Sequence, residues 1–134
     1  MPHLVILYTP QLDAETDMGA LCRKLADTML AARDDAGQAV FPTGGVRVLA
    51  YPAAHSAVAD GRRDYAFAYL NLRMARGRPS LVQRRVGEAL SATARAHFAP
   101  LLEKRYIGIT LQIDEGPEVY DSKNSTIHPL FKKD

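Results

Sequence analysis

The chain has 134 residues, of which 47% are hydrophobic and 24% are charged, and its formal net charge at pH 7 is +2. These values are typical of one ordinary globular domain, and the interspersed acids and bases do not indicate a nucleic-acid or membrane surface. The single cysteine, Cys22, excludes a disulfide within the chain, and no apolar run approaches the roughly 20 residues needed to cross a bilayer. Because no secretion signal opens the sequence, we expect a cytoplasmic protein.

The first half of the chain predicts a strand, a helix and a second strand. Residues 3–8 are mostly apolar, and the Thr9-Pro10 pair ends this strand because proline cannot continue a ladder. Residues 12–35 have the period of an amphipathic helix. Its apolar side is formed by Met18, Leu21, Leu25, Met29 and Ala32. Residues 46–51 then form a strand that places Arg47, Leu49 and Tyr51 on one face.

The second half repeats this order. Residues 64–74 alternate as a third strand, one face of which carries Tyr65, Phe67, Tyr69, Asn71 and Arg73. We expect Ser80 to cap a second long helix and Pro100 to kink or shorten its last turns. The apolar stripe of this helix is Leu81, Val82, Val86, Ala89, Leu90, Thr93, His97 and Phe98. Residues 106–114 alternate as a fourth strand.

The order of elements predicts an α+β fold made of a duplicated β-α-β unit. The units span about 2–60 and 61–115, and a tail at 116–134 completes a single domain of residues 1–134. A crossover helix makes the two strands of each unit parallel, which gives a four-stranded sheet with both helices on one face. The other face carries aromatic side chains, so it is covered either by other subunits or by burial within one subunit. The same two alternatives apply to the apolar end of the tail, residues 127–131.

The amino-terminal Met1-Pro2 pair is a candidate for chemistry. A small second residue normally allows the initiator methionine to be removed, which would leave Pro2 with a free secondary amine at the mouth of the first strand. An ordinary α-amine has a pKa of roughly 7.7–8.0, so a modest perturbation makes it a base at neutral pH. The alternative is that Pro2 only begins an edge strand.

Arginines in loops and at strand ends are the remaining candidates, because the sequence has no phosphate-binding glycine loop and no zinc-ligand spacing. Arg47 enters a strand on the aromatic face, where it would be costly without an anionic partner. The alternative is a solvated arginine or an internal salt bridge. We interpret His97 as a satisfied core histidine and Cys22 as a packing residue.

Six strings occur in matching order along the chain and together resemble one family. They are Pro-His-Leu-Val-Ile at 2–6, Phe-Pro-Thr-Gly-Gly-Val-Arg at 41–47, Ala-Asp-Gly-x-x-Asp-Tyr-Ala-Phe at 59–67, Gly-Arg at 77–78, Ala-His-Phe at 96–98 and His-Pro-Leu-Phe-Lys at 128–132. The sequence resembles the 5-carboxymethyl-2-hydroxymuconate delta-isomerases of the tautomerase superfamily from Pro2 to Lys132. It departs from their pattern at Tyr51 and Pro52, and its region 11–38 is several residues longer.

The resemblance implies a fold, an activity and a set of site residues. It implies a homotrimer whose chains each have the duplicated β-α-β fold. It also implies an isomerase that needs neither a cofactor nor a metal and that acts in homoprotocatechuate degradation. Pro2 matches the proton-shuttling base, and Arg47 and Arg78 match arginines that hold the carboxylates of a multiply carboxylated dienol substrate. No nucleic-acid or membrane partner is implied. The alternatives are another proline-based tautomerase, of the phenylpyruvate type, and a non-catalytic ferredoxin-like ligand-binding module.

Overall fold

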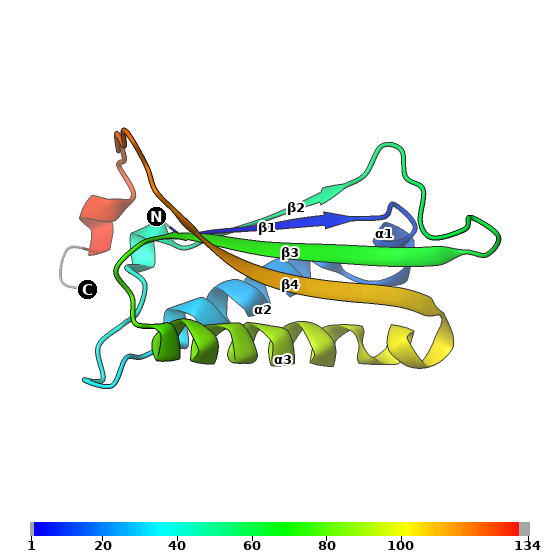
Figure 1. The fold of residues 1–134 in the computed structure, drawn as a ribbon, viewed down its shortest axis with the longest axis horizontal. Coiled ribbons are helices and arrows are strands. Elements are labelled where there is room, and N and C mark those ends of the chain that lie inside the picture. Colours follow the sequence, from blue (N-terminus) through cyan, green and yellow to red (C-terminus); the bar gives the residue numbers. More distant parts are fainter. Residues whose placement is uncertain (1, 132–134) are drawn as a thin grey trace.

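Residues 2–131 are described by a computed structural model, in which one mixed sheet is covered on one face by two helices (Figure 1). The sheet has the order β2-β1-β3-β4, with β1 parallel to β2, β3 parallel to β4, and β1 antiparallel to β3. The strands are β1 (His3–Tyr8), β2 (Arg47–Pro52), β3 (Tyr65–Ala75) and β4 (Tyr106–Gly116). The helices are α1 (Leu12–Glu15), α2 (Met18–Ala31) and α3 (Ser80–Lys104), with 3-10 turns η1 (Thr43–Gly45) and η2 (His128–Phe131). The predicted α+β class and the duplicated β-α-β order are confirmed.

Three details of the predicted helices are wrong. The helix expected over residues 12–35 is divided, because Asp17 is extended and its carboxylate accepts a hydrogen bond from the Ala20 amide at 2.9 Å, which starts a new helix. Ser80 is not a cap: it is the first residue of α3, and Pro79 precedes it without a side-chain cap. The expected shortening at Pro100 is also wrong, because α3 continues to Lys104. Near the end of a helix, proline removes one backbone hydrogen bond and leaves most of the ladder intact.

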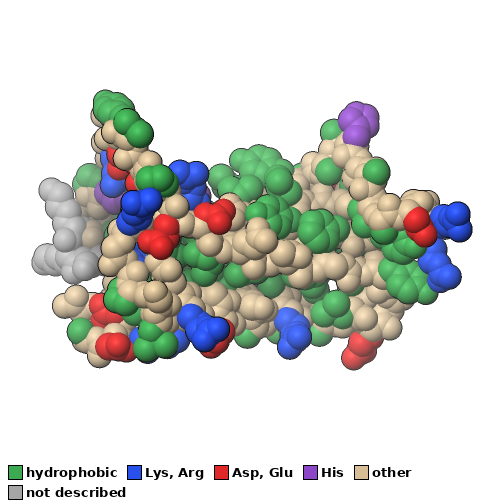
Figure 2. Space-filling view, viewed as in Figure 1, with side chains coloured by type: hydrophobic (Ala, Val, Ile, Leu, Met, Phe, Trp, Pro, Cys, Tyr) green, Lys and Arg blue, Asp and Glu red, His purple; other side chains and the backbone are tan. Residues whose placement is uncertain are grey.

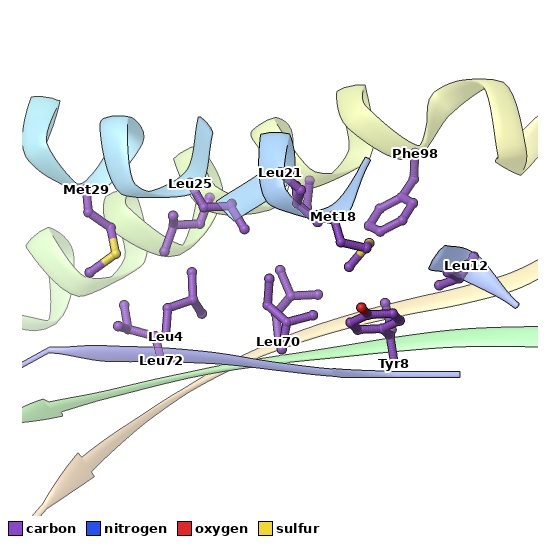
Figure 3. Close-up of a cluster of buried hydrophobic side chains, with 14 of the residues drawn as sticks. Leu4, Tyr8, Leu12, Met18, Leu21, Leu25, Met29, Leu70, Leu72 and Phe98 are labelled. Carbon is purple, nitrogen blue, oxygen red and sulfur yellow. The ribbon is translucent and has the colours of Figure 1, made fainter. Parts of the chain in front are cut away.

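The hydrophobic core lies between the sheet and helices α2 and α3 (Figure 3). The side chains that fill it are fully buried, and they include Leu4, Ile6, Leu21, Leu25, Leu70, Leu72, Leu90 and Phe98. Most of the predicted stripe positions are confirmed, but Ala89 is exposed and Leu81 is 59% exposed at the start of α3, whereas Ala94 is buried. No helix among residues 2–131 is long and apolar enough to span a bilayer.

The sheet face away from the helices exposes large apolar side chains; we call it the open face. In Figure 2 hydrophobic side chains gather on it, between the loop that follows β2 and the segment that follows β4. Leu7 is 50% exposed, Leu49 46% and Tyr51 50%. Within the described chain these side chains are therefore not buried, which removes the alternative of burial within one subunit.

His97 joins α2 to α3 through hydrogen bonds at both ring nitrogens. Its Nε2 lies 2.8 Å from the Thr16 hydroxyl and its Nδ1 lies 3.2 Å from the Lys24 ammonium. Because Lys24 can only donate, Nδ1 accepts and Nε2–H donates to Thr16. Burial, followed by the charge of Lys24, lowers the pKa of His97. This geometry agrees with the prediction of a satisfied histidine, although the ring is only half-buried.

We expect the folded protein to lose stability as the pH falls below about 6.5, the ordinary pKa of histidine. The unfolded chain then takes up a proton at residue 97 that the folded chain resists, and the loss is at most about 1.4 kcal/mol per pH unit for one histidine. Urea unfolding of His97→Gln at pH 7.5 and pH 5.5 should show a smaller pH effect than in the wild type. The control is His55→Gln, at an exposed loop position; an unchanged slope in His97→Gln would contradict the assignment.

Candidate active site

The three predicted site residues lie at one end of the sheet. Pro2 directly precedes β1, Arg47 opens β2 beside His3, and Arg78 follows the end of β3 by three residues. Because β3 runs antiparallel to β1, the end of β3 lies beside the start of β1. Figure 1 shows the N-terminus, η1 (cyan) and η2 (red) at this same end. The fold thus gathers residues from both halves of the sequence.

Pro2 is buried beside η1 and the end of the tail. From here on, the tail means residues 117–131, the described residues that follow β4. A Cβ added to Gly45 would lie 3.7 Å from Pro2 Cδ and 3.5 Å from His128 Nε2. A Cβ added to Gly44 would lie only 2.9 Å from His128 Cα, which is closer than real side chains approach. The Gly44-Gly45 pair therefore lets the tail pack against the turn next to Pro2. Both strings are visible in the sequence, but their contact depends on the fold.

Arg47 lines a cavity of about 450 Å³ at this end of the open face. His3 and Arg73 also line it, together with tail residues between 118 and 125. Burial is the largest cause that lowers the pKa of His3, and the positive charges of Arg47 and Arg73 lower it further. The imidazole is therefore neutral at neutral pH and can exchange hydrogen bonds with a ligand.

Arg78 donates hydrogen bonds to the backbone of its own chain. Its Nε donates to the Val40 carbonyl and its Nη1 donates to the Ala75 carbonyl, both at 3.3 Å. Its guanidinium also lies 4.9 Å from the centroid of the buried Phe41 ring. Burial lowers the pKa of Arg78. Arg78 does not line the cavity that contains Arg47, although both lie at the same end of the sheet.

Sequence reasoning missed His3, Arg73 and the tail as neighbours of the candidate site. Arg73 was among the strand-end arginines and was placed on the same face as the aromatic row. The strand register that sets it beside His3 could not be obtained from alternation, which assigns faces but not pairs. The closing His128 string and the Gly44-Gly45 pair were the available signals for the tail contact.

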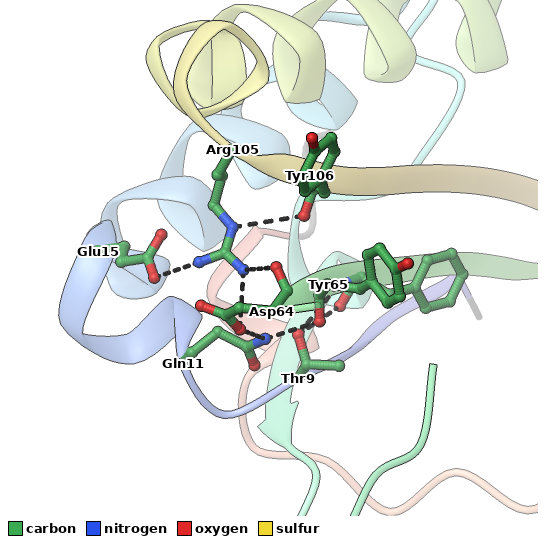
Figure 4. A network of polar contacts seen from close by, with 8 residues as sticks. Thr9, Gln11, Glu15, Asp64, Tyr65, Arg105 and Tyr106 are labelled. Carbon is green, nitrogen blue, oxygen red and sulfur yellow. Dashed lines mark hydrogen bonds and ion pairs between the residues drawn. The ribbon is translucent and has the colours of Figure 1, made fainter. Parts of the chain in front are cut away.

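The opposite end of the sheet holds a different cluster, centred on Arg105 (Figure 4). Arg105 forms ion pairs with Glu15 at 2.5 Å and with Asp64 at 3.1 Å, and its side chain is 12% exposed. Gln11 also donates to Asp64, at 3.0 Å. Because these partners occupy the guanidinium, we interpret the cluster as a structural connection between α1 and the starts of β3 and β4.

The fold defines the class of protein, and Pro2 does not line the cavity that contains Arg47. The sheet and helices are those of the tautomerase fold. A family model described as 5-carboxymethyl-2-hydroxymuconate isomerase matches residues 2–131. The chain therefore belongs to this family of isomerases.

Individual relatives support this assignment. The chain is 29% identical over 132 residues to a 5-carboxymethyl-2-hydroxymuconate Delta-isomerase of Escherichia coli, a match that covers 98% of this chain and 100% of that protein. It is 60% identical to a 5-carboxymethyl-2-hydroxymuconate delta-isomerase of known structure, with a TM-score of 0.94 over 98% of this chain and 93% of that one. The fold alone is shared with a fused 4-OT solved as an asymmetric trimer, at 17% identity and a TM-score of 0.59 over 96% and 97% of the two chains.

Proposed function

We propose that this chain isomerises 5-carboxymethyl-2-hydroxymuconate from a dienol to a conjugated enone, in cytoplasmic homoprotocatechuate degradation. The observation that carries the proposal is the family match, which begins at Pro2 and continues through Arg47 and Arg78. The relatives named for this reaction support the choice of substrate. The cavity beside His3 and Arg47 supports a ligand that carries negative charge.

Pro2 is the proposed general acid and base. Once Met1 is removed, its amine nitrogen takes the proton of the enol hydroxyl and returns a proton at the distant carbon of the diene. The substrate loses one proton and gains one, so the amine ends in its starting state and the reaction needs no cofactor. Burial of Pro2 disfavours the protonated, charged form of this amine. A base whose pKa lies near the working pH transfers protons efficiently in both directions.

Arg47 and Arg78 are the proposed binders of carboxylate and dienolate oxygens. A guanidinium offers two parallel donors that match a carboxylate, and its fixed charge stabilises negative charge that develops on the enol oxygen. Arg47 suits this role because, among residues 2–131, it makes no ion pair and lines the cavity. Arg78 would act from the loop after β3, where the Val40 and Ala75 carbonyls hold its guanidinium.

We also propose that the active protein is a homotrimer. The open face presents Leu7, Leu49 and Tyr51 to solvent in the single chain, and covering such a patch is favourable. A fold neighbour is described as a trimer, which supports this number of subunits.

The test of the proposed function is turnover of two enols that differ in carboxylate number. We expect kcat/KM for 5-carboxymethyl-2-hydroxymuconate to exceed that for phenylenolpyruvate, which has one carboxylate, and Arg47→Ala to raise KM for the former by about 10- to 100-fold. Ultraviolet absorbance of the conjugated product reports both rates. Arg62→Ala, in an exposed loop at the other end of the sheet, is the control. Preference for phenylenolpyruvate would contradict the substrate, and an unchanged KM would contradict the role of Arg47.

A further inference from the structure

A row of basic side chains crosses three strands at the candidate site. His3 is the register partner of Arg47 on β2 and of Arg73 on β3, so the three side chains project from the same face of the sheet. Neighbouring strands lie about 4.8 Å apart, which places the Cα atoms of the two arginines about 10 Å apart with His3 between them. Two separated guanidinium groups on one wall suit a ligand with two separated carboxylates.

The two arginines of this row have no anionic partner within residues 2–131. No ion pair there includes Arg47 or Arg73. Asp114, the β4 partner of Arg73, instead accepts a hydrogen bond from Asn71 Nδ2 at 2.9 Å. On the facing tail, Asp121 forms an ion pair with Lys123 at 3.2 Å, and Glu118, which also lines the cavity, forms no ion pair with either arginine. The strand side of the cavity is therefore cationic, with its donors available to an incoming anion.

The position of Arg73 depends on a glycine. A Cβ added to Gly116 would lie 2.5 Å from Arg73 Nη2, 2.7 Å from Nε and 2.9 Å from Cζ. The guanidinium therefore lies against the bare Cα of the last residue of β4, in space that any side chain at position 116 would occupy. Gly116 is buried, whereas Arg73 remains exposed to a ligand in the cavity.

We propose that Arg73 binds a second carboxylate of the substrate, opposite the one held by Arg47, and that it makes the site selective for multiply carboxylated ligands. This inference rests on the proposed function for the identity of the substrate, but not for the binding of dicarboxylates. It assigns to Arg73 a contact on the wall of the cavity that contains Arg47, a cavity that Arg78 does not line.

Equilibrium binding tests the site without turnover. Calorimetry should show that the wild-type protein binds adipate, which has two carboxylates, more tightly than valerate, which has one. Arg73→Ala should weaken adipate binding by about 10- to 100-fold, the usual range for a lost charge-assisted hydrogen bond, and should change valerate binding much less. Gly116→Ala should reproduce the selective loss because it displaces the guanidinium. Arg76→Ala removes an exposed arginine outside the cavity and should change neither affinity.

Kinetics separates this inference from the proposed function. Arg73→Ala should raise KM for 5-carboxymethyl-2-hydroxymuconate by about 10- to 100-fold and leave KM for phenylenolpyruvate nearly unchanged, and Arg73→Lys should recover part of the loss. Absence of turnover in the wild type with retained selective adipate binding would overturn the proposed function alone. Equal losses for both ligands, or adipate binding unaffected by Arg73→Ala, would overturn the role of Arg73. Thermal melting of each variant separates a binding effect from loss of the fold.

Discussion

Pro2→Ala should lower kcat/KM for dienol isomerisation by about 10²- to 10⁴-fold, the range expected when a positioned general acid–base is lost. Alanine at position 2 still permits removal of Met1, but it replaces the ring amine by a primary amine on a flexible backbone. The base is then neither held beside η1 nor tuned as the proline amine is. The fold should be unaffected, because the residue precedes β1 and forms none of its register pairs.

Protein that retains Met1 gives a sharper test of the role of Pro2. In a protein that retains Met1, the Pro2 nitrogen is a tertiary amide without a basic lone pair, so turnover should be lost to at least the same degree. Intact mass measures the fraction of chains that begin at Pro2, and activity should scale with that fraction. Pro10→Ala, at an exposed position after the far end of β1, is the control. Full turnover by chains that retain Met1 would exclude Pro2 as the base.

Leu7→Asp should dissociate the oligomer while leaving the subunit folded. Leu7 lies at the centre of the open face, where its register partners are Tyr51 and Tyr69, and it is 50% exposed in the single chain. In an assembled protein the new carboxylate would be buried without a partner, at a cost of about 3–5 kcal/mol per site, or at least about 100-fold in the dissociation constant. Light scattering coupled to size exclusion, over a dilution series, measures the shift from trimer to monomer.

The matched control is Leu81→Asp, because Leu81 is 59% exposed at the start of α3 and lies outside the open face. This variant should keep the mass of the wild type. Circular dichroism should show the same helix and strand content for both variants. Retention of the wild-type mass by Leu7→Asp would show that the open face is not the interface, and a monomeric wild type would contradict the proposed trimer.

Local periodicity was sufficient to predict the elements and the faces of the strands. Alternation in residues 64–74 correctly separated the buried Leu70 and Leu72 from the open-face Tyr69. It worked because successive strand side chains point to opposite sides, so one buried face imposes a period of two on the sequence. The ends of the helices were less predictable, because a cap such as Asp17 depends on the local backbone as well as on residue type.

The candidate site was likewise only partly predictable from the sequence. Pro2 and Arg47 could be chosen from the sequence because one directly precedes a predicted strand and the other opens one, and a charged residue on an apolar face requires an explanation. The sequence by itself also determined the family, since six separate strings occur in matching order. Beyond Arg47, the resemblance pointed to Arg78 and gave Arg73 no role, although both lie near the end of β3.

Tertiary structure sets the surroundings of these two arginines. Strand register sets Arg73 beside His3 and Arg47, and the bare Cα of Gly116 gives its guanidinium room. Folding of the loop at residues 40–41 places a carbonyl and an aromatic ring against Arg78 instead. These contacts join residues about 30 to 70 positions apart in the chain. Long-range pairing of this kind is set by the packing of whole elements, and no local pattern in the sequence encodes which two side chains finally meet.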